Sequence, residues 1–155
     1  MPDKPDIVLK PPLAALGALA ICIVGQALLP ASWLNIVPPD IAAFLGPFFL
    51  VIGFGIAGTA ILAFRRAQTN IEPSKPALAV VHSGPYRFTR NPMYIGLLSV
   101  HLGLGIILSL DWALVVTIAL WVFLHFGVVL REETYLSNKF GPEYHALLRS
   151  TRRWF

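Results

Sequence analysis

The sequence predicts an all-α protein: a polytopic transmembrane helical bundle of about four spans, with a cytoplasmic interfacial loop and an amphipathic C-terminal tail. Of its 155 residues, 56% are hydrophobic and only 13% are charged, whereas a soluble globular domain carries roughly 25% charged residues. The mean hydropathy is +0.69 and the mass is 17.0 kDa, and a domain of that size buries too little surface to hide so many apolar side chains. These observations exclude an ordinary cytosolic domain, a disordered chain and a collagen-like chain.

Four stretches of the chain contain no Asp, Glu, Lys or Arg, and they cover residues 13–29, 41–64, 93–110 and 112–130. A helix of roughly 20 residues crosses the hydrocarbon core of a bilayer, so the second stretch can span it with tilt and the others can span it with help from their flanks. Membrane β-strands are excluded, because these runs are continuous rather than alternating. We therefore expect one integral-membrane domain over residues 1–155.

The first stretch has an alternative interpretation as a cleaved signal peptide, because Lys4 and Lys10 precede it. It is somewhat long for that role and a poor cleavage site follows it, and the sequence leaves its retention open. A single residue, Asp111, separates the last two stretches, which predicts a tight helical hairpin with Asp111 at its tip. Ser109 and Asp111 are candidate caps of the fourth helix.

The distribution of basic residues predicts the orientation of the bundle. All 12 Lys and Arg residues lie before the first span, in the loop between the second and third spans, or after the fourth span. Loops that are rich in Lys and Arg remain in the cytoplasm. We therefore expect a multi-pass protein of the cell (inner) membrane, with both termini and any chemistry on the cytoplasmic side.

The polar segments carry several local signals. Pro92 suits the first turn of the third helix, with Asn91 as its N-cap. The tail has apolar residues near helical spacing that are interrupted at Gly141-Pro142. Trp154-Phe155, with two arginines beside it, suits an interfacial anchor.

Several motifs within the spans have a structural and a functional interpretation. Gly53-x-Gly55-x-x-Gly58 matches the dinucleotide-binding pattern, but that pattern requires a βαβ unit, so close helix packing is favoured. His101 and His125 are either neutral, hydrogen-bonded residues or functional groups facing a cavity. They lack a convincing third ligand, so no metal site is expected.

Glu132-Glu133 is more informative, because two carboxylates are electrostatically misplaced at a helix C-terminus. The pair either marks the end of the fourth span or holds a cation or the hydroxyl groups of a ligand. Tyr86, Arg87, Arg90, Asn91 and Tyr94 are expected at the same face of the membrane. Together these residues suit a ligand that carries a carboxylate, an ammonium group and a nucleoside.

Four short motifs occur in order along the second half of the chain. They are Gly84-Pro85-Tyr86-Arg87, Arg90-Asn91-Pro92-Met93-Tyr94-x-Gly96, Glu132-Glu133 and Phe140-Gly141-x-x-Tyr144. In this order and spacing, they resemble the isoprenylcysteine carboxyl methyltransferase and phospholipid methyltransferase superfamily over about residues 53–155. Members of this superfamily are integral-membrane enzymes that use S-adenosylmethionine, and the resemblance implies the same activity here.

The resemblance also implies roles for single residues. Arg90, Pro92 and Tyr94 match a motif that shapes the cofactor pocket, and Glu132-Glu133 matches paired glutamates that bind the cofactor. Asn91 stands where the carboxyl methyltransferases typically have histidine, so this motif is closer to the phosphatidylethanolamine methyltransferase branch.

Two further correspondences lie within the spans. Gly53 and Gly55 resemble a Gly-x-Gly element of the same branch. His125 resembles a histidine often seen two turns before the glutamates.

We therefore expect catalytic roles for Arg90, Glu133 and His125. The residues expected to bind S-adenosylmethionine are Tyr86, Arg87, Arg90, Asn91, Pro92, Tyr94, Glu132, Glu133, Gly53 and Gly55.

The expected acceptor is a membrane lipid or lipidated substrate, either the carboxylate of an isoprenylcysteine or the amine of a phospholipid. No nucleic acid partner is expected, and the sequence leaves the oligomeric state open. The alternatives are an NADPH-dependent enzyme similar to the sterol reductases and a non-catalytic small membrane assembly subunit.

Overall fold

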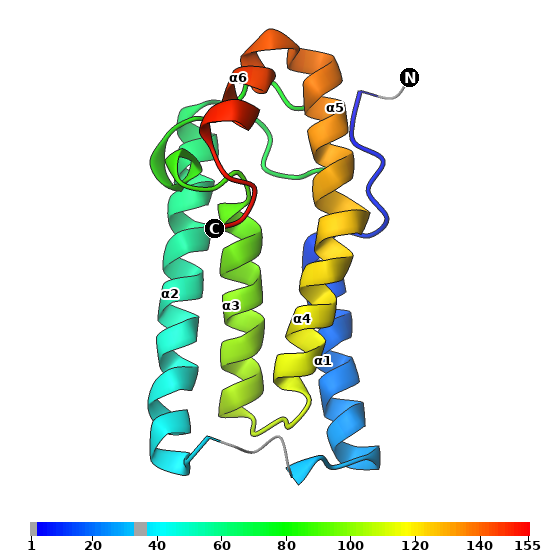
Figure 1. Ribbon diagram of the computed structural model, residues 1–155, viewed down its shortest axis with the longest axis vertical. Helices are drawn as coiled ribbons and strands as arrows, with labels where there is room; N and C mark the ends of the chain where they lie inside the picture. Colours follow the sequence, from blue (N-terminus) through cyan, green and yellow to red (C-terminus); the bar gives the residue numbers. More distant parts are fainter. Residues whose placement is uncertain (1–2, 33–36) are drawn as a thin grey trace.

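The computed structural model describes residues 3–32 and 37–155 of the chain (Figure 1). Within these residues the chain is helical and has no β-strand, which confirms the predicted all-α class. The elements in chain order are α1 (Pro11–Leu28), α2 (Pro39–Arg66), the 3₁₀ turn η2 (Gly84–Arg87), α3 (Pro92–Ile107), α4 (Ala113–Leu124), the π-helical turn η3 (His125–Val129), α5 (Leu130–Phe140) and α6 (Pro142–Ser150).

The long helices form a bundle in which α3 lies between α2 and α4, and α1 packs against α3 and α4. Three helices are long and apolar enough to cross a membrane: α1, α2 and the continuous helix Ala113–Phe140. The apolar α3 has 16 residues and is therefore about 24 Å long, somewhat shorter than the hydrocarbon core. The four predicted apolar helices are thus all present.

Glycines allow α2 and α3 to approach closely. A Cβ atom at Gly53 would lie 2.8 Å from the carbonyl oxygen of Gly96, and a Cβ atom at Gly96 would lie 2.7 Å from that of Gly53. A Cβ atom at Gly103 would similarly lie 2.9 Å from the carbonyl oxygen of Gly46. These contacts support the packing interpretation for Gly53. Gly55 instead has open space where its Cβ atom would be.

The fourth helix does not end at residue 130, as its apolar stretch suggested. It continues through η3 into α5 and reaches Phe140. In η3 the carbonyl oxygen of Gly127 accepts a hydrogen bond from the backbone N–H of Val8, at 3.0 Å. The predicted interruption of the tail is confirmed, because Gly141 has a φ of +51° and Pro142 begins α6.

The predicted capping of the fourth helix is wrong, because no side chain caps α4. The Asp111 carboxylate instead accepts hydrogen bonds from Ala31 N at 2.9 Å and Gln26 Nε2 at 3.2 Å. The Gln26 side chain in turn accepts from Asp111 N, at 2.9 Å. The hairpin tip is therefore tied to the end of α1 rather than to the helix that follows it.

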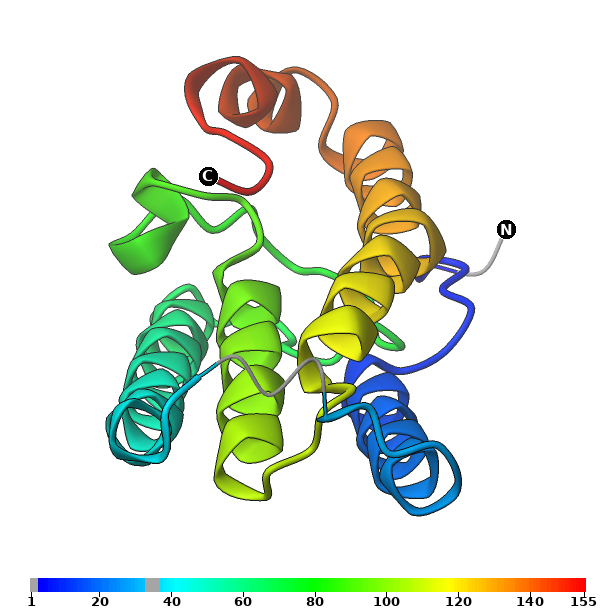
Figure 2. The ribbon, with the colours of Figure 1, turned by 60° about the horizontal axis from the view of Figure 1, so that its bottom comes forward.

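The opposite end of the bundle holds most of the polar chain, and we call it the polar end. The N-terminal segment (residues 3–10), the loop 67–91, α5, α6 and the C-terminal strap (residues 151–155) meet there (Figures 1 and 2). Both ends of the described chain and the long loop therefore lie at the same end of the molecule, as an even number of spans requires.

Candidate functional site

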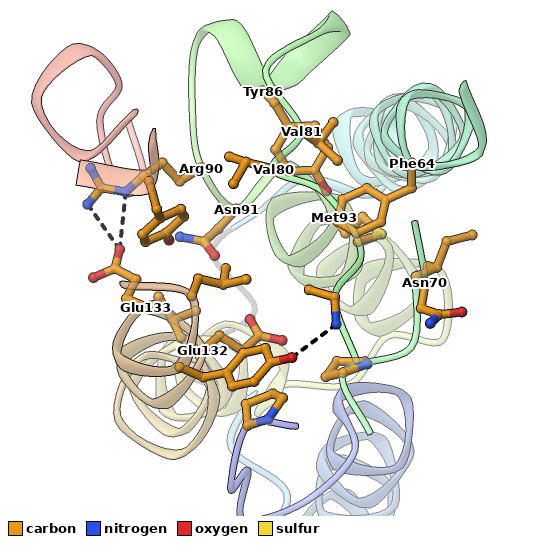
Figure 3. Close-up of a pocket in the computed structure, with 18 of the residues that line it drawn as sticks. Phe64, Asn70, Val80, Val81, Tyr86, Arg90, Asn91, Met93, Glu132 and Glu133 are labelled. Carbon is orange, nitrogen blue, oxygen red and sulfur yellow. Dashed lines mark hydrogen bonds and ion pairs between the residues drawn. The ribbon is translucent and has the colours of Figure 1, made fainter. Parts of the chain in front are cut away.

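A cavity opens at the polar end between α5, the start of α3 and the loop 67–91 (Figure 3). Its empty space, counted together with the open mouth, is about 860 Å³. Its floor is apolar and includes Phe64, Met93 and Val129. The lining residues that can hydrogen-bond or carry charge are Asn70, Glu72, Lys75, Tyr86, Arg90, Asn91, Tyr94, Glu132, Glu133, Tyr135 and Tyr144.

Glu133 forms one wall of the cavity together with two arginines. Its carboxylate accepts from Arg90 Nε at 3.1 Å and Arg90 Nη2 at 3.0 Å. On the other side it accepts from Arg153 Nε at 3.0 Å and Arg153 Nη2 at 2.8 Å. The side chains of Arg90 and Glu133 are only 10% and 12% exposed, so this ion pair is shielded from water.

The Arg90 guanidinium also holds the C-terminal part of the chain. Its Nη1 donates to the carbonyl oxygens of Leu148 at 3.0 Å and Thr151 at 2.6 Å. All three of its side-chain nitrogens therefore have protein partners. Arg90 joins α3, α5 and α6 at the cavity wall, and its contacts are those of a positioning residue.

Glu132 has a different environment from its neighbour. It makes no ion pair among the described residues, and its Oε1 accepts a hydrogen bond from Tyr94 Oη at 2.8 Å. It follows the apolar stretch of the fourth helix, and Figure 3 shows it beside the cavity. Desolvation, opposed by the Tyr94 hydrogen bond and assisted by the charge of Glu133, raises the pKa of Glu132 from 4.5 to about 7.

Two other ionisable groups of the lining, Glu72 and Tyr86, have pKa values that are shifted for different reasons. Hydrogen bonds from Lys10 and Ser74 lower the pKa of Glu72 to about 2, so Glu72 remains an ionised partner of Lys10. Burial, with the nearby Glu132 charge, raises the pKa of the Tyr86 hydroxyl well above its usual value. Within the described residues, Glu132 is therefore the one carboxylic acid of the lining that lacks a cationic partner, and it gains or loses its proton near neutral pH.

The C-terminal strap closes the outer side of this wall. Arg90 N donates to Arg152 O at 2.9 Å, and Thr89 pairs with Arg152 as an isolated parallel bridge. Asn91 occupies the N-cap position of α3, as predicted, but its side chain makes no capping hydrogen bond and donates instead to Arg153 O at 2.8 Å. Pro92 does begin α3, as predicted.

The predicted membrane anchor at the end of the chain is only partly present. Trp154 turns inward, where its Nε1 donates to His125 Nδ1 at 3.1 Å and its ring packs against the core. Phe155 is 82% exposed.

The structure brings together six of the predicted site residues at the cavity: Tyr86, Arg90, Asn91, Tyr94, Glu132 and Glu133. Five others lie outside its lining. Pro92 is buried behind it, and Arg87 is exposed and lines an outer hollow. Gly53 lies in the α2–α3 contact, Gly55 faces open space, and His125 contacts the strap.

Sequence reasoning missed several lining or wall residues. Arg153 was assigned to a membrane anchor, although it binds Glu133 from the far end of the chain. Tyr135 and Asn70 carried no motif, and they line the cavity from α5 and the loop. Tyr144 stood within the Phe140-Gly141-x-x-Tyr144 motif, which was the available signal for it.

A family model for phospholipid methyltransferases (PEMT) matches residues 41–143. No curated protein and no solved structure matches the chain. The matched region covers α3, α4, α5 and nearly all of α2. It includes the acidic and aromatic cavity residues that the motifs identified, apart from the one in α6. Because this match spans well over half of the sequence, the chain belongs to the phospholipid methyltransferase family, a group of membrane methyltransferases.

Proposed function

We propose that this protein transfers a methyl group from S-adenosylmethionine to a lipid or lipidated acceptor, and that the cofactor binds in the cavity at the polar end. The observation that supports this best is Glu132, a carboxylate without a cationic partner among the described residues, placed in a cavity with tyrosine side chains. Family membership supports the same activity.

The lining fits the charges of S-adenosylmethionine. A sulfonium and an ammonium group are both cations, and Glu132 supplies the negative charge that would attract them. The rings of Tyr86 and Tyr94 lie in the same lining, and aromatic faces bind cations favourably.

When bound, S-adenosylmethionine would supply an activated methyl group for in-line displacement. The residues of this chain would then orient the donor and exclude water, and such positioning can lower a barrier by roughly 7–11 kcal/mol. We assign Glu132 to the cationic part of the cofactor. We assign Arg90, Glu133 and Arg153 to holding the wall in place, and Asn91 to the same wall.

An amine acceptor would also need to lose a proton. Glu132 is better placed for this than His125, because it lines the cavity whereas His125 lies against Trp154. A carboxylate acceptor would need no base. The site lies beside the start of α3 and of α5, so a lipid could enter between helices while the cofactor arrives from water.

Charge distribution supports a cytoplasmic location for this site. The polar end contains the loop 67–91, α5 and α6, where the basic residues concentrate. Segments with this composition remain in the cytoplasm, which is where S-adenosylmethionine would be available to the cavity.

Isothermal titration calorimetry of the purified protein in detergent tests cofactor binding. We expect saturable heat with S-adenosylmethionine and at least tenfold weaker binding in Glu132→Gln. The matched control is Glu143→Gln, because Glu143 is an exposed acid of α6 that lies outside the cavity lining. A folded preparation that gives no heat at millimolar cofactor would contradict the proposal.

The acceptor can be identified with a methyl-labelled cofactor and a total lipid extract. We expect label in a lipid fraction, and the labelled head group distinguishes N-methylation from O-methylation. Cofactor binding without label in any lipid would retain the cofactor site and remove the lipid acceptor.

A further inference from the structure

The cations of the polar end form two groups on opposite sides of the molecule. Beside the N-terminal segment and α5, basic side chains pair with acids: Lys10 with Glu72, Arg131 with Asp6, and Lys139 with Asp3. Figures 1 and 2 place this group on the side where the N-terminus lies, away from α2 and η2.

On the other side, five exposed arginines make no ion pair within residues 3–32 and 37–155. They lie at the end of α2, in η2, in α6 and in the C-terminal strap. We call this set the arginine face: Arg65, Arg66, Arg87, Arg149 and Arg152.

The arginine face carries more positive charge than the acid beside it, Glu143 of α6, can offset. All 8 acidic residues belong to the described part of the chain. Of those at the polar end, Asp3, Asp6, Glu72 and Glu133 pair with other Lys or Arg residues, Glu132 faces the cavity, and Glu143 lies 3.7 Å from His82. Asp40 and Asp111 lie at the opposite end of the bundle. The surplus of positive charge on this face therefore favours an anionic partner outside the protein.

The surroundings of the arginines fit the headgroup layer of a membrane. Arg65 and Arg66 directly follow the apolar stretch of α2, so they lie where hydrocarbon gives way to headgroups. Phe88 follows Arg87 and is 78% exposed. Such a combination of an exposed aromatic ring with cations is typical of residues at a membrane interface.

A shallow hollow within this face adds hydrogen-bond donors. It is lined by His82, Tyr86, Arg87, Ser150 and Thr151. Guanidinium groups bind phosphate oxygens with directed, charge-assisted hydrogen bonds, and hydroxyl groups can donate to the same oxygens. The chemistry of the hollow therefore suits a phosphate group.

We propose that the arginine face binds the headgroups of anionic phospholipids in the membrane that holds the bundle. The hollow beside Arg87 receives a headgroup phosphate, and Phe88 enters the interface next to it. This binding does not depend on methyl transfer, so it stands or falls separately from the proposed activity.

Native mass spectrometry of the detergent-purified protein tests this, with phosphatidylglycerol and phosphatidylcholine titrated separately. We expect the wild type to prefer phosphatidylglycerol. Each arginine that is removed should weaken that binding about fivefold, so Arg65→Gln/Arg66→Gln and Arg87→Gln/Arg152→Gln should each lose most of the preference.

The matched control is Lys10→Gln/Lys139→Gln, which also removes two cations, but from the paired side. It should keep the preference for phosphatidylglycerol. Equal binding of the two lipids by the wild type, or an equal loss in this control, would overturn the proposal.

A salt series on the wild type keeps the test independent of whether the variants fold. Binding of phosphatidylglycerol should weaken steeply as sodium chloride is raised, because exposed charges are screened, while binding of phosphatidylcholine should not change. Phosphatidylglycerol binding that does not respond to salt would also overturn the proposal.

Discussion

Glu132 and Glu133 are adjacent in the chain but have opposite environments. Successive residues of a helix point about 100° apart, so Glu133 reaches Arg90 and Arg153 while Glu132 reaches Tyr94. The carboxylate of Glu133 is paired with two arginines and holds the cavity wall together. The other retains a charge that a cationic ligand can use.

The raised pKa of Glu132, about 7, predicts that cofactor affinity depends on pH. Glu132 is largely protonated at pH 5.5 and more ionised at pH 7.5, and only the ionised form attracts a cation strongly. The affinity for S-adenosylmethionine should therefore rise between these values. Calorimetry at both pH values, with Glu132→Gln showing a flatter profile and Glu143→Gln the wild-type profile, checks this.

The raised pKa of Glu132 also affects the stability of the fold, which should fall with rising pH whereas the cofactor affinity should rise. The folded protein binds the Glu132 proton more tightly than the unfolded chain does, so the free energy of unfolding falls as pH rises from about 4.5 to 7. Glu132→Gln should remove this fall and melt higher than the wild type at pH 8. If Glu132→Gln melts lower at pH 8 than at pH 5 by as much as we expect for the wild type, Glu132 is not the origin of the effect.

Arg90 and Arg153 should differ in their contribution to stability. Arg90→Ala removes a shielded ion pair and two carbonyl contacts, and breaking such a pair costs about 3–5 kcal/mol. The Arg153 side chain is 37% exposed, so Arg153→Ala should cost about 1 kcal/mol. Thermal unfolding in detergent compares the two variants, and equal losses would contradict the ranking.

At the scale of elements, the contact between α2 and α3 predicts a sharp difference between neighbouring glycines. Gly53→Ala places a Cβ atom within 2.8 Å of backbone, and such overpacking costs about 1–3 kcal/mol. Gly55→Ala meets open space and should leave stability unchanged or slightly raised. Melting temperatures of the two variants give the comparison, and equal losses would exclude close packing at Gly53.

The C-terminal strap predicts a second effect at this scale. Deleting residues 151–155 removes carbonyl partners of Arg90, Thr89 and Asn91 and the indole that binds His125. We expect weaker cofactor binding by at least tenfold and faster proteolysis of α6. Deleting Phe155 alone is the control, because its side chain is 82% exposed and should leave both measurements unchanged.

At the scale of the whole molecule, the proposed orientation can be tested by cysteine labelling. The native Cys22 is buried, so an introduced cysteine is the accessible one. Ser83→Cys lies at the polar end, and a membrane-impermeant maleimide should label it only from the cytoplasmic side. Val37→Cys lies at the other end and should react only from outside, and the reverse pattern would contradict the orientation.

Much of the architecture could be predicted from the sequence, because an uncharged run of sufficient length has few alternatives to a spanning helix. Asp111 correctly predicted the position of the hairpin, and Gly141-Pro142 correctly predicted the break between α5 and α6. The ordered motifs also brought Arg90, Tyr94 and Glu133 to one site. These predictions rest on local composition and order, which a single sequence contains.

The remainder depended on contacts between distant parts of the chain. An aromatic residue beside arginines suits a membrane interface, yet Trp154 contacts His125 because the strap pairs with Thr89. Likewise, nothing in the local sequence assigns Arg153 to Glu133. Which of the two adjacent carboxylates is left without an arginine partner also depends on helix rotation, which the sequence pattern does not define.

That rotation is controlled by η3. A π-helical turn accommodates one residue more than an α-helical turn, so it changes the direction of every side chain that follows by about 100°. Deleting Phe126, which is 62% exposed, would return the helix to regular winding and turn Glu132 out of the cavity, leaving composition and hydropathy almost the same. A single extra amino acid in the middle of an apolar helix would thus decide whether Glu132 points into the cavity or away from it.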